Sequence, residues 1–255
     1  MTIEADLHTH SLASCCGLHT ILELLKQAER KKLKALAITD HGPWLQSRIN
    51  SVFFERFQNP IRKVRLYKGI ECNIISQSGA IDLPPVYSKN CDIVLAGLHN
   101  IETGRGNPYY TEMLINALKT NPGIDIITHP NDENYPVDFK ALADTAREYG
   151  AALEINNSKI LYRRVDDKIT LALIRACREA YCPVVVNSDT HSLHEVGETA
   201  LAMKMLVREK FPREMILNRR FTVIEQFIKK RKSAKLLPYN LYREKNDFKA
   251  EPVLK

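Results

Sequence analysis

The stretch Val184-Val-Val-Asn-Ser-Asp-Thr-His191 shows the pattern that decides the fold, a short β-branched apolar run followed at once by an acid and an imidazole. Runs that are apolar on both faces are typical of parallel strands covered by helices. Seven such runs are predicted to be strands, at 3–7, 35–38, 66–72, 93–96, 124–127, 152–155 and 184–187.

Amphipathic segments alternate with these runs, and we predict helices at 20–31, 110–119, 139–149 and 167–180. Regular alternation favours a closed or nearly closed α/β barrel over an open doubly wound sheet. No glycine-rich phosphate fingerprint follows the first strand, which argues against a dinucleotide-binding fold. The chain of 255 residues fits one barrel. We predict a single domain over residues 1–232, including C-terminal helices, and a basic irregular tail over 233–255.

Composition narrows the compartment and the partners. The six cysteines form no C-x-x-C pair, the first residues show no signal-peptide pattern, and no apolar run approaches a membrane span. We therefore expect a cytoplasmic protein without a membrane partner. The formal charge of +7 is concentrated in residues 200–255, where 15 Lys and Arg face 6 Asp and Glu. A basic end can attract nucleic acid, but we favour a solvated tail.

Histidines and acids gather where the predicted strands end. Eight residues share this position: His8, His10, His41, Glu71, His99, His129, Asp189 and His191. In a parallel barrel the carboxyl ends of the strands meet at one rim, where the catalytic groups of such enzymes lie. Eight ligands are too many for one ion, and nitrogen with oxygen donors suits Zn, Mn or Fe. The sequence therefore predicts two or three divalent metal ions, most favourably Zn.

These motifs occur in the order of a known family. Asp6-Leu-His8-Thr-His10, Ile38-Thr-Asp-His41, Gly69-Ile-Glu71, Gly97-Leu-His99, Thr128-His129-Pro130, Leu153-Glu-Ile-Asn-Asn157 and Ser188-Asp-Thr-His191 resemble the PHP (polymerase and histidinol phosphatase) superfamily. The match looks closest to the compact stand-alone PHP phosphatases. The resemblance implies a distorted (β/α)7 barrel with three metal ions at the carboxyl ends of the strands.

The resemblance also implies how the ligands are shared. One ion would be held by His8, His10, Glu71 and Asp189. Glu71 would bridge to a second ion completed by His99 and His129, and His41 with His191 would hold the third.

The third site departs from the family pattern. The family places a histidine in the loop after the first strand, whereas this chain has Cys16 there by position. A thiolate binds zinc well, so we expect an occupied third site that favours zinc over manganese and is sensitive to oxidation. His19 as a substitute ligand, and a weak or absent third ion, are the alternatives.

Other polar residues near the predicted strand ends are candidates for roles beyond metal binding. Asp40 is our catalytic candidate, to position or protonate a group, with support of a ligating histidine as the alternative. Substrate-binding candidates are Asn156, Asn157, Arg105 and Lys159.

The predicted function is a metal-dependent phosphomonoesterase that cleaves a small phosphorylated metabolite with a metal-bound hydroxide. Histidinol phosphate is one candidate substrate by resemblance. A phosphodiesterase or exonuclease acting on nucleic acid is the alternative, and a non-catalytic metal-binding interaction module is the third reading. Assembly into a homo-oligomer is left open.

Overall fold

The structure of the chain is a computed structural model that describes residues 2–241. Seven parallel strands form one sheet in sequence order, each hydrogen-bonded to its neighbour along the chain. They are β1 (Ala5–Asp6), β2 (Ala35–Ile38), β3 (Arg65–Asn73), β4 (Ile93–Gly97), β5 (Ile126–Ile127), β6 (Ala152–Asn156) and β7 (Val184–Asn187). All seven predicted strands are present, and the predicted (β/α)7 barrel is confirmed.

The barrel closes between its first and last strands, β1 and β7, through one short backbone contact and hydrogen bonds from a side chain. Thr9 and Thr190 form an isolated parallel bridge, in which the amide of His10 donates to the carbonyl of Thr190 over 2.9 Å. The buried side-chain amide of Asn218 donates to the carbonyls of Ala5 (2.9 Å) and Val186 (2.7 Å). One asparagine therefore supplies a hydrogen bond to a backbone carbonyl of β1 and to one of β7, so that these carbonyls at the two edges of the sheet are not left unpaired.

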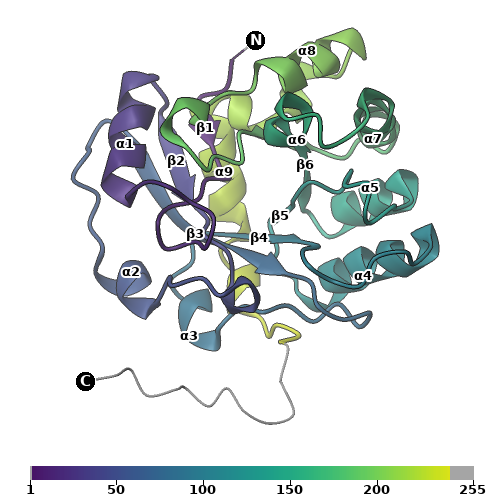
Figure 1. Cartoon of the computed structure of the whole chain (residues 1–255), viewed down its shortest axis with the longest axis horizontal. Coiled ribbons are helices and arrows are strands. Elements are labelled where there is room, and N and C mark those ends of the chain that lie inside the picture. The colour runs from purple at the N-terminus through teal and green to yellow at the C-terminus, as the bar shows by residue number, and fades with distance from the viewer. Residues whose placement is uncertain (1, 242–255) are drawn as a thin grey trace.

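Helices surround the strands as the chain advances from α1 to α8, as Figure 1 shows. The described residues contain α1 (Ile21–Arg30), α2 (Ser51–Arg56), α3 (Pro85–Ser88), α4 (Asn107–Thr120), α5 (Phe139–Glu148), α6 (Asn157–Leu161), α7 (Asp167–Glu179), α8 (Ala200–Arg208) and α9 (Phe221–Arg231). The four predicted helices correspond to α1, α4, α5 and α7. Their starts follow local rules, because Thr20 makes a capping box with Glu23, and Asp138 and Asp166 cap α5 and α7.

Two apolar clusters hold these layers. The larger lies between the strands and the outer helices. The smaller fills the barrel with inward-facing residues such as Ala35, Leu95 and Val185, and includes Ile224 and Ile228 of α9. Helix α9, which passes behind the strands in Figure 1, therefore closes the amino end of the barrel. The carboxyl end of the strands is left open.

A buried ion network fastens the segment that includes α9. Asp125 precedes β5 and is fully buried, and its carboxylate accepts from Arg231 (2.9 Å) and Lys235 (2.8 Å). Leu241 forms a parallel bridge with Ile81. Residues 233–241 thus contact the barrel, while the rest of the predicted tail, 242–255, lies outside the described residues. The domain boundary at Lys232 stays a prediction.

Within residues 2–241, no helix combines the length and the apolar character that crossing a membrane would require.

Candidate metal centre

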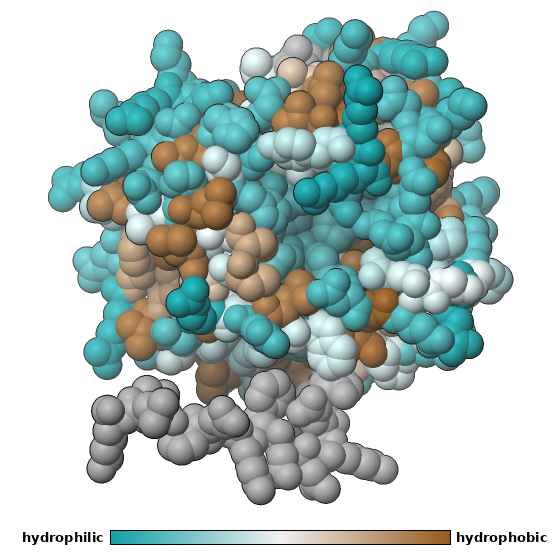
Figure 2. Space-filling model, in the orientation of Figure 1, coloured by the Kyte–Doolittle hydropathy of each residue, from teal (hydrophilic) through white to brown (hydrophobic). Residues whose placement is uncertain are grey.

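The open end of the barrel gathers the residues that sequence reasoning selected. These residues belong to six parallel strands or to the loops that follow them, and each residue lies near the carboxyl end of its strand or just beyond it. The strands are β1, β2, β3, β4, β5 and β7. Figure 2, in the same orientation, shows a hydrophilic hollow near the middle of this face. We call the eight residues His8, His10, His41, Glu71, His99, His129, Asp189 and His191 the histidine–carboxylate cluster.

Glu71 of β3 lies at the centre of this cluster. Its Oε2 atom is 3.1 Å from His8 Nε2 and 2.9 Å from His41 Nδ1. Its Oε1 atom is 3.2 Å from His99 Nε2 and 3.1 Å from His129 Nε2. The two oxygens therefore face different imidazoles, as a carboxylate shared between cations would.

Asp189 provides a second carboxylate on the other side of β1. Its Oδ1 atom lies 3.2 Å from His10 Nε2 and 3.4 Å from His8 Nε2. His8 and His10, two residues apart, point to the same side of the chain as their spacing predicts. Both imidazoles therefore lie between Asp189 and Glu71.

The spacing of the nitrogens is compatible with metal coordination. His8 Nε2 lies 3.1 Å from His10 Nε2, and His99 Nε2 lies 3.1 Å from His129 Nε2. Two nitrogens bound at about 2.0–2.1 Å to one tetrahedral ion are roughly 3.3–3.4 Å apart, a little more than these distances. In addition, the buried atoms His41 Nδ1 and Glu71 Oε2 make no geometrically valid hydrogen bond among the described residues, although they are close together. Cations between these atoms would satisfy them.

Hydrogen bonds fix which nitrogen of several imidazoles faces the cluster. His8 Nδ1 lies 2.8 Å from Glu154 Oε1, and His99 Nδ1 lies 3.2 Å from Asn73 Oδ1. His191 Nδ1 lies 2.8 Å from the backbone carbonyl of Asp189. Because these oxygens accept, each Nδ1 carries the proton and each Nε2 keeps a lone pair for a metal.

Backbone strain occurs at two members of the cluster. His129 has a φ of +29° and Asp189 a φ of +53°, both in a region that non-glycine residues rarely adopt. Such conformations cost about 1–3 kcal/mol and persist only where surrounding contacts enforce them. The His129 amide donates to Glu154 Oε2 over 2.9 Å, which is one such contact. These conformations therefore destabilise the fold slightly and orient the two side chains towards the cluster.

Electrostatics keep the carboxylates ionised. Burial acts to raise the pKa of Glu71, but the surrounding imidazoles, led by His8 and His99, hold it well below its ordinary range. The pKa of Asp189 is likewise held well below its ordinary range, by His8 and His10 against burial. Burial lowers the pKa of His10 to about 3, so this imidazole is neutral and free to bind a metal.

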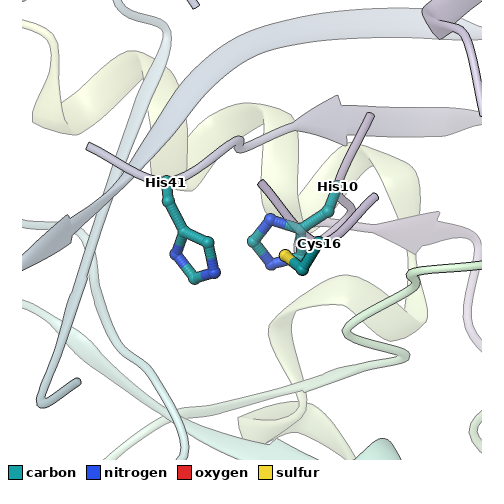
Figure 3. Close-up of side chains that lie close together, drawn as sticks. All are labelled: His10, Cys16 and His41. Carbon is teal, nitrogen blue, oxygen red and sulfur yellow. The ribbon is translucent and has the colours of Figure 1, made fainter. Parts of the chain in front are cut away.

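Cys16 lies at the edge of the cluster. His10, Cys16 and His41 offer ligand atoms that all fall within 4.8 Å of one another. Figure 3 shows the Cys16 sulfur beside the His10 ring, with the His41 ring facing both. Burial acts to raise the pKa of the Cys16 thiol, but hydrogen bonds with His191 and His41 lower it to about 6. Thiolate character is what a zinc ligand requires.

The catalytic candidate Asp40 makes contacts of a different kind. It is fully buried, and its two oxygens accept from the amide (2.6 Å) and the hydroxyl (2.7 Å) of Ser11. These bonds anchor the loop that carries Cys16. Burial raises the pKa of Asp40 to about 6 despite these bonds. Its catalytic role stays a prediction.

The four substrate-binding candidates separate in space. Asn156 Nδ2 lies 3.1 Å from Asp189 Oδ2, next to the cluster, and Lys159 pairs with Asp132. The Asn157 carboxamide instead accepts from the Ala202 amide of α8 over 3.0 Å. Arg105 is exposed and pairs with Glu102 at 2.8 Å. Only Asn156 contacts the cluster directly among these described contacts, and the substrate roles stay predictions.

Sequence reasoning gave no role to Glu154 and Asn73, although both contact imidazoles of the cluster. Glu154 is fully buried in β6 and accepts from His8, His129, Asn156 and Asn187. The available signal was a carboxylate inside the apolar run Ala152-Leu-Glu-Ile, which a buried strand tolerates only when the charge has partners. For Asn73 the only sequence signal was its position two residues after Glu71, on the same face of β3.

Comparison with known proteins agrees with the family resemblance of the sequence motifs. The model of the PHP domain family matches residues 6–158. The chain belongs to the PHP domain family. A PHP relative from Caldanaerobacter subterraneus subsp. tengcongensis, described as a "probable phosphatase", is 36% identical over 238 residues, covering 91% of this chain and 93% of that protein. One from Shewanella halifaxensis, with the same description, is 35% identical over 252 residues, covering 96% and 100%.

Solved structures share the PHP fold at low identity. Histidinol phosphate phosphatase from Lactococcus lactis subsp. lactis, complexed with Zn, L-histidinol and phosphate, superposes with a TM-score of 0.58 at 14% identity, covering 82% of this chain and 94% of that one. A chain of archaeal ribonuclease P with mature tRNA superposes with a TM-score of 0.56 at 14% identity, covering 95% and 99%. At such identities the likeness concerns the fold alone.

Proposed function

We propose that this chain is a metal-dependent phosphatase that hydrolyses the phosphomonoester of a small metabolite. The observation that carries the proposal is Glu71, whose two oxygens each face two imidazole nitrogens at 2.9–3.2 Å. Full-length relatives described as probable phosphatases support the same reaction class. The neighbour solved with Zn, L-histidinol and phosphate supports zinc as the first metal to test.

We assign the ligands to three groups. His8, His10, Glu71 and Asp189 hold one ion, and Glu71, His99 and His129 hold a second. His41, His191 and Cys16 hold the third. The distances from Glu71 to His8, His99 and His129 support the first two groups, and the closeness of Cys16 to His41 supports the third. Zinc suits a set that mixes imidazole, carboxylate and thiolate, while manganese or iron remain to be tested at the first two sites.

Bound divalent ions would supply a water activated near neutral pH and would neutralise charge on the phosphoryl oxygens. The chain's own residues prepare the site for them. Glu154 holds the proton of His8 on Nδ1, and Asn73 does the same for His99. Asn156 donates to both Glu154 (3.0 Å) and Asp189 (3.1 Å), which fixes the orientation of these carboxylates. Lys159 lies in α6, three residues after Asn156, and pairs with Asp132. It is our candidate for attracting the substrate phosphate.

The decisive experiment compares two generic substrates on metal-loaded protein. We expect p-nitrophenyl phosphate to be hydrolysed with added Zn or Mn, and a chelator to abolish the reaction. The Asp189→Asn variant should lose activity, because it removes the anionic ligand that lies between two imidazoles. Glu148→Gln, on the exposed face of α5, is the matched control.

The same experiment separates the competing functions. Faster hydrolysis of bis-p-nitrophenyl phosphate or single-stranded DNA would replace the monoesterase by a phosphodiesterase. Full zinc occupancy without hydrolysis of any ester would favour a non-catalytic module. A panel of phosphorylated metabolites that includes histidinol phosphate would then identify the substrate. Size-exclusion chromatography with light scattering would determine the oligomeric state, which the sequence leaves open.

A further inference from the structure

A cavity lies at the amino end of the barrel, opposite the histidine–carboxylate cluster. It has a volume of about 370 Å³ and is lined by residues at the amino ends of β3 and β4 and by α9 and the segment that follows it. Arg65, the first residue of β3, and Asp92, immediately before β4, belong to its lining. The volume lies in the range of pockets for small ligands. None of its lining residues belongs to the histidine–carboxylate cluster.

The lining carries an excess of positive charge. Five basic and two acidic residues line the cavity. Two of the basic residues have carboxylate partners, because Lys235 pairs with Asp125 at 2.8 Å and Lys229 lies 3.4 Å from Glu225. The other three, Arg65, Lys89 and Lys232, have no carboxylate within ion-pair distance among residues 2–241.

A buried hydroxyl without a partner lies in the same lining. The Tyr67 side chain is only 2% exposed, and its hydroxyl has no hydrogen-bond partner within the described part of the chain. The guanidinium of Arg65 lies 5.5 Å from the centre of its ring. Burial raises the pKa of Tyr67 to about 12, so the phenol keeps its proton and can donate. An unsatisfied buried hydroxyl destabilises the folded chain, and an oxygen of a bound ligand would satisfy it.

We propose that this cavity binds a small organic phosphate. Its phosphate group would pair with Arg65, Lys89 and Lys232 and accept a hydrogen bond from the Tyr67 hydroxyl. The cavity is larger than an inorganic anion needs, and the buried Ile228 side chain offers an apolar contact for the organic part. This binding site is separate from the proposed phosphatase centre and does not depend on it.

The test follows Tyr67 directly. Metal-loaded protein is labelled with 3-fluorotyrosine, and the ¹⁹F resonance of Tyr67 is assigned by its absence in Tyr67→Phe. We use phenylphosphonate as the probe, because its carbon–phosphorus bond resists phosphatase action. We expect a saturable shift of the Tyr67 resonance that sodium chloride at equal ionic strength does not produce.

Charge variants locate the ligand. The double variant Lys89→Ala/Lys232→Ala should weaken phenylphosphonate binding by about tenfold, the effect of removing two exposed charges. The control Lys230→Ala removes an exposed lysine of α9 that does not line the cavity, and binding should be unchanged. Zinc content and p-nitrophenyl phosphate hydrolysis should match the parent protein in all three, which shows that the fold and the metal centre are intact.

Several results would overturn the proposal. A Tyr67 resonance that does not move, or that moves equally in the double variant, would exclude binding in this cavity. An equal response to inorganic phosphate at the same concentration would show an anion site without selection for an organic group. A response to a single-stranded oligonucleotide but not to phenylphosphonate would replace the small ligand by nucleic acid.

Discussion

Glu154 offers the sharpest test of how the barrel prepares its metal centre. Its Oε1 accepts from His8 Nδ1 (2.8 Å) and Asn187 Nδ2 (2.9 Å), and its Oε2 accepts from the His129 amide (2.9 Å) and Asn156 Nδ2 (3.0 Å). The substitution Glu154→Gln keeps the shape but replaces one oxygen by an amino group. Towards the His129 amide and Asn156 that group faces two donors, so two of the four hydrogen bonds are lost. Towards His8 and Asn187 only the bond from Asn187 is lost, because the His8 imidazole can change tautomer and accept.

The magnitude follows from these contacts. Losing one or two hydrogen bonds to a buried charged group should lower the free energy of unfolding of the metal-free protein by about 2–6 kcal/mol. With its amino group towards His8, the glutamine would also push the imidazole proton to Nε2, where the metal should bind. Loss of such an orienting partner typically weakens metal binding 10–100-fold. We therefore expect zinc affinity of Glu154→Gln to fall by that factor.

Two measurements check the reasoning. Zinc affinity is measured by competition with a chelating dye, and stability by urea unfolding of the metal-free protein. The matched control is Asp125→Asn, which alters another fully buried carboxylate, at the amino end of the barrel. It should lower stability but leave zinc affinity unchanged. A zinc affinity of Glu154→Gln within twofold of the parent protein would refute the role assigned to Glu154.

Three further predictions concern single positions. In the metal-free protein, iodoacetamide should modify Cys16 selectively above about pH 6, where its thiolate forms, and slowly below this pH. Mass spectrometry measures the modification. If bound zinc does not protect Cys16 from iodoacetamide, Cys16 is not a ligand. Asp125→Asn should destabilise the protein by about 3–5 kcal/mol in urea, because Arg231 and Lys235 lose their buried partner; a loss below 1 kcal/mol would contradict this. Gly97→Ala would place a Cβ 2.2 Å from Thr128 Oγ1 and should reduce phosphatase activity, and adding Thr128→Ala should restore part of it; a double variant no better than Gly97→Ala would count against this clash.

Much of this architecture was predictable because it depends on local pattern. Each strand contains a short apolar run, and each ligand lies near the carboxyl end of its strand or just beyond it, so the parallel barrel brings the ligands to one rim without further information. The strands and four of the helices follow from such runs and from caps such as Thr20 and Asp138. The ligand assignment itself rests on resemblance and awaits metal analysis.

The remainder depends on contacts between distant parts of the chain. Glu154 and His8 are 146 residues apart in sequence, and only the assembled barrel shows that they meet. Asn157 follows the last residue of β6, as a mouth residue would, but it begins α6 and its carboxamide turns to α8. Lys235 lies in a basic segment, yet it is buried against Asp125, 110 residues earlier. Composition alone does not distinguish such a lysine from a solvated one.

The contact that closes the barrel between β1 and β7 is made by residues next to the ligands of the metal centre, which links stability to function. The bridge that joins β1 to β7 pairs Thr9 with Thr190. Thr9 lies between His8 and His10, and Thr190 lies between Asp189 and His191. An ion held by His8, His10 and Asp189 would therefore join β1 to β7 where their backbones meet through a single isolated bridge and Asn218 already supplies side-chain hydrogen bonds. Any ion bound there stabilises the folded state by its binding free energy, because the unfolded chain does not assemble these ligands. The strain at Asp189 then lies on the element that metal binding would hold in place.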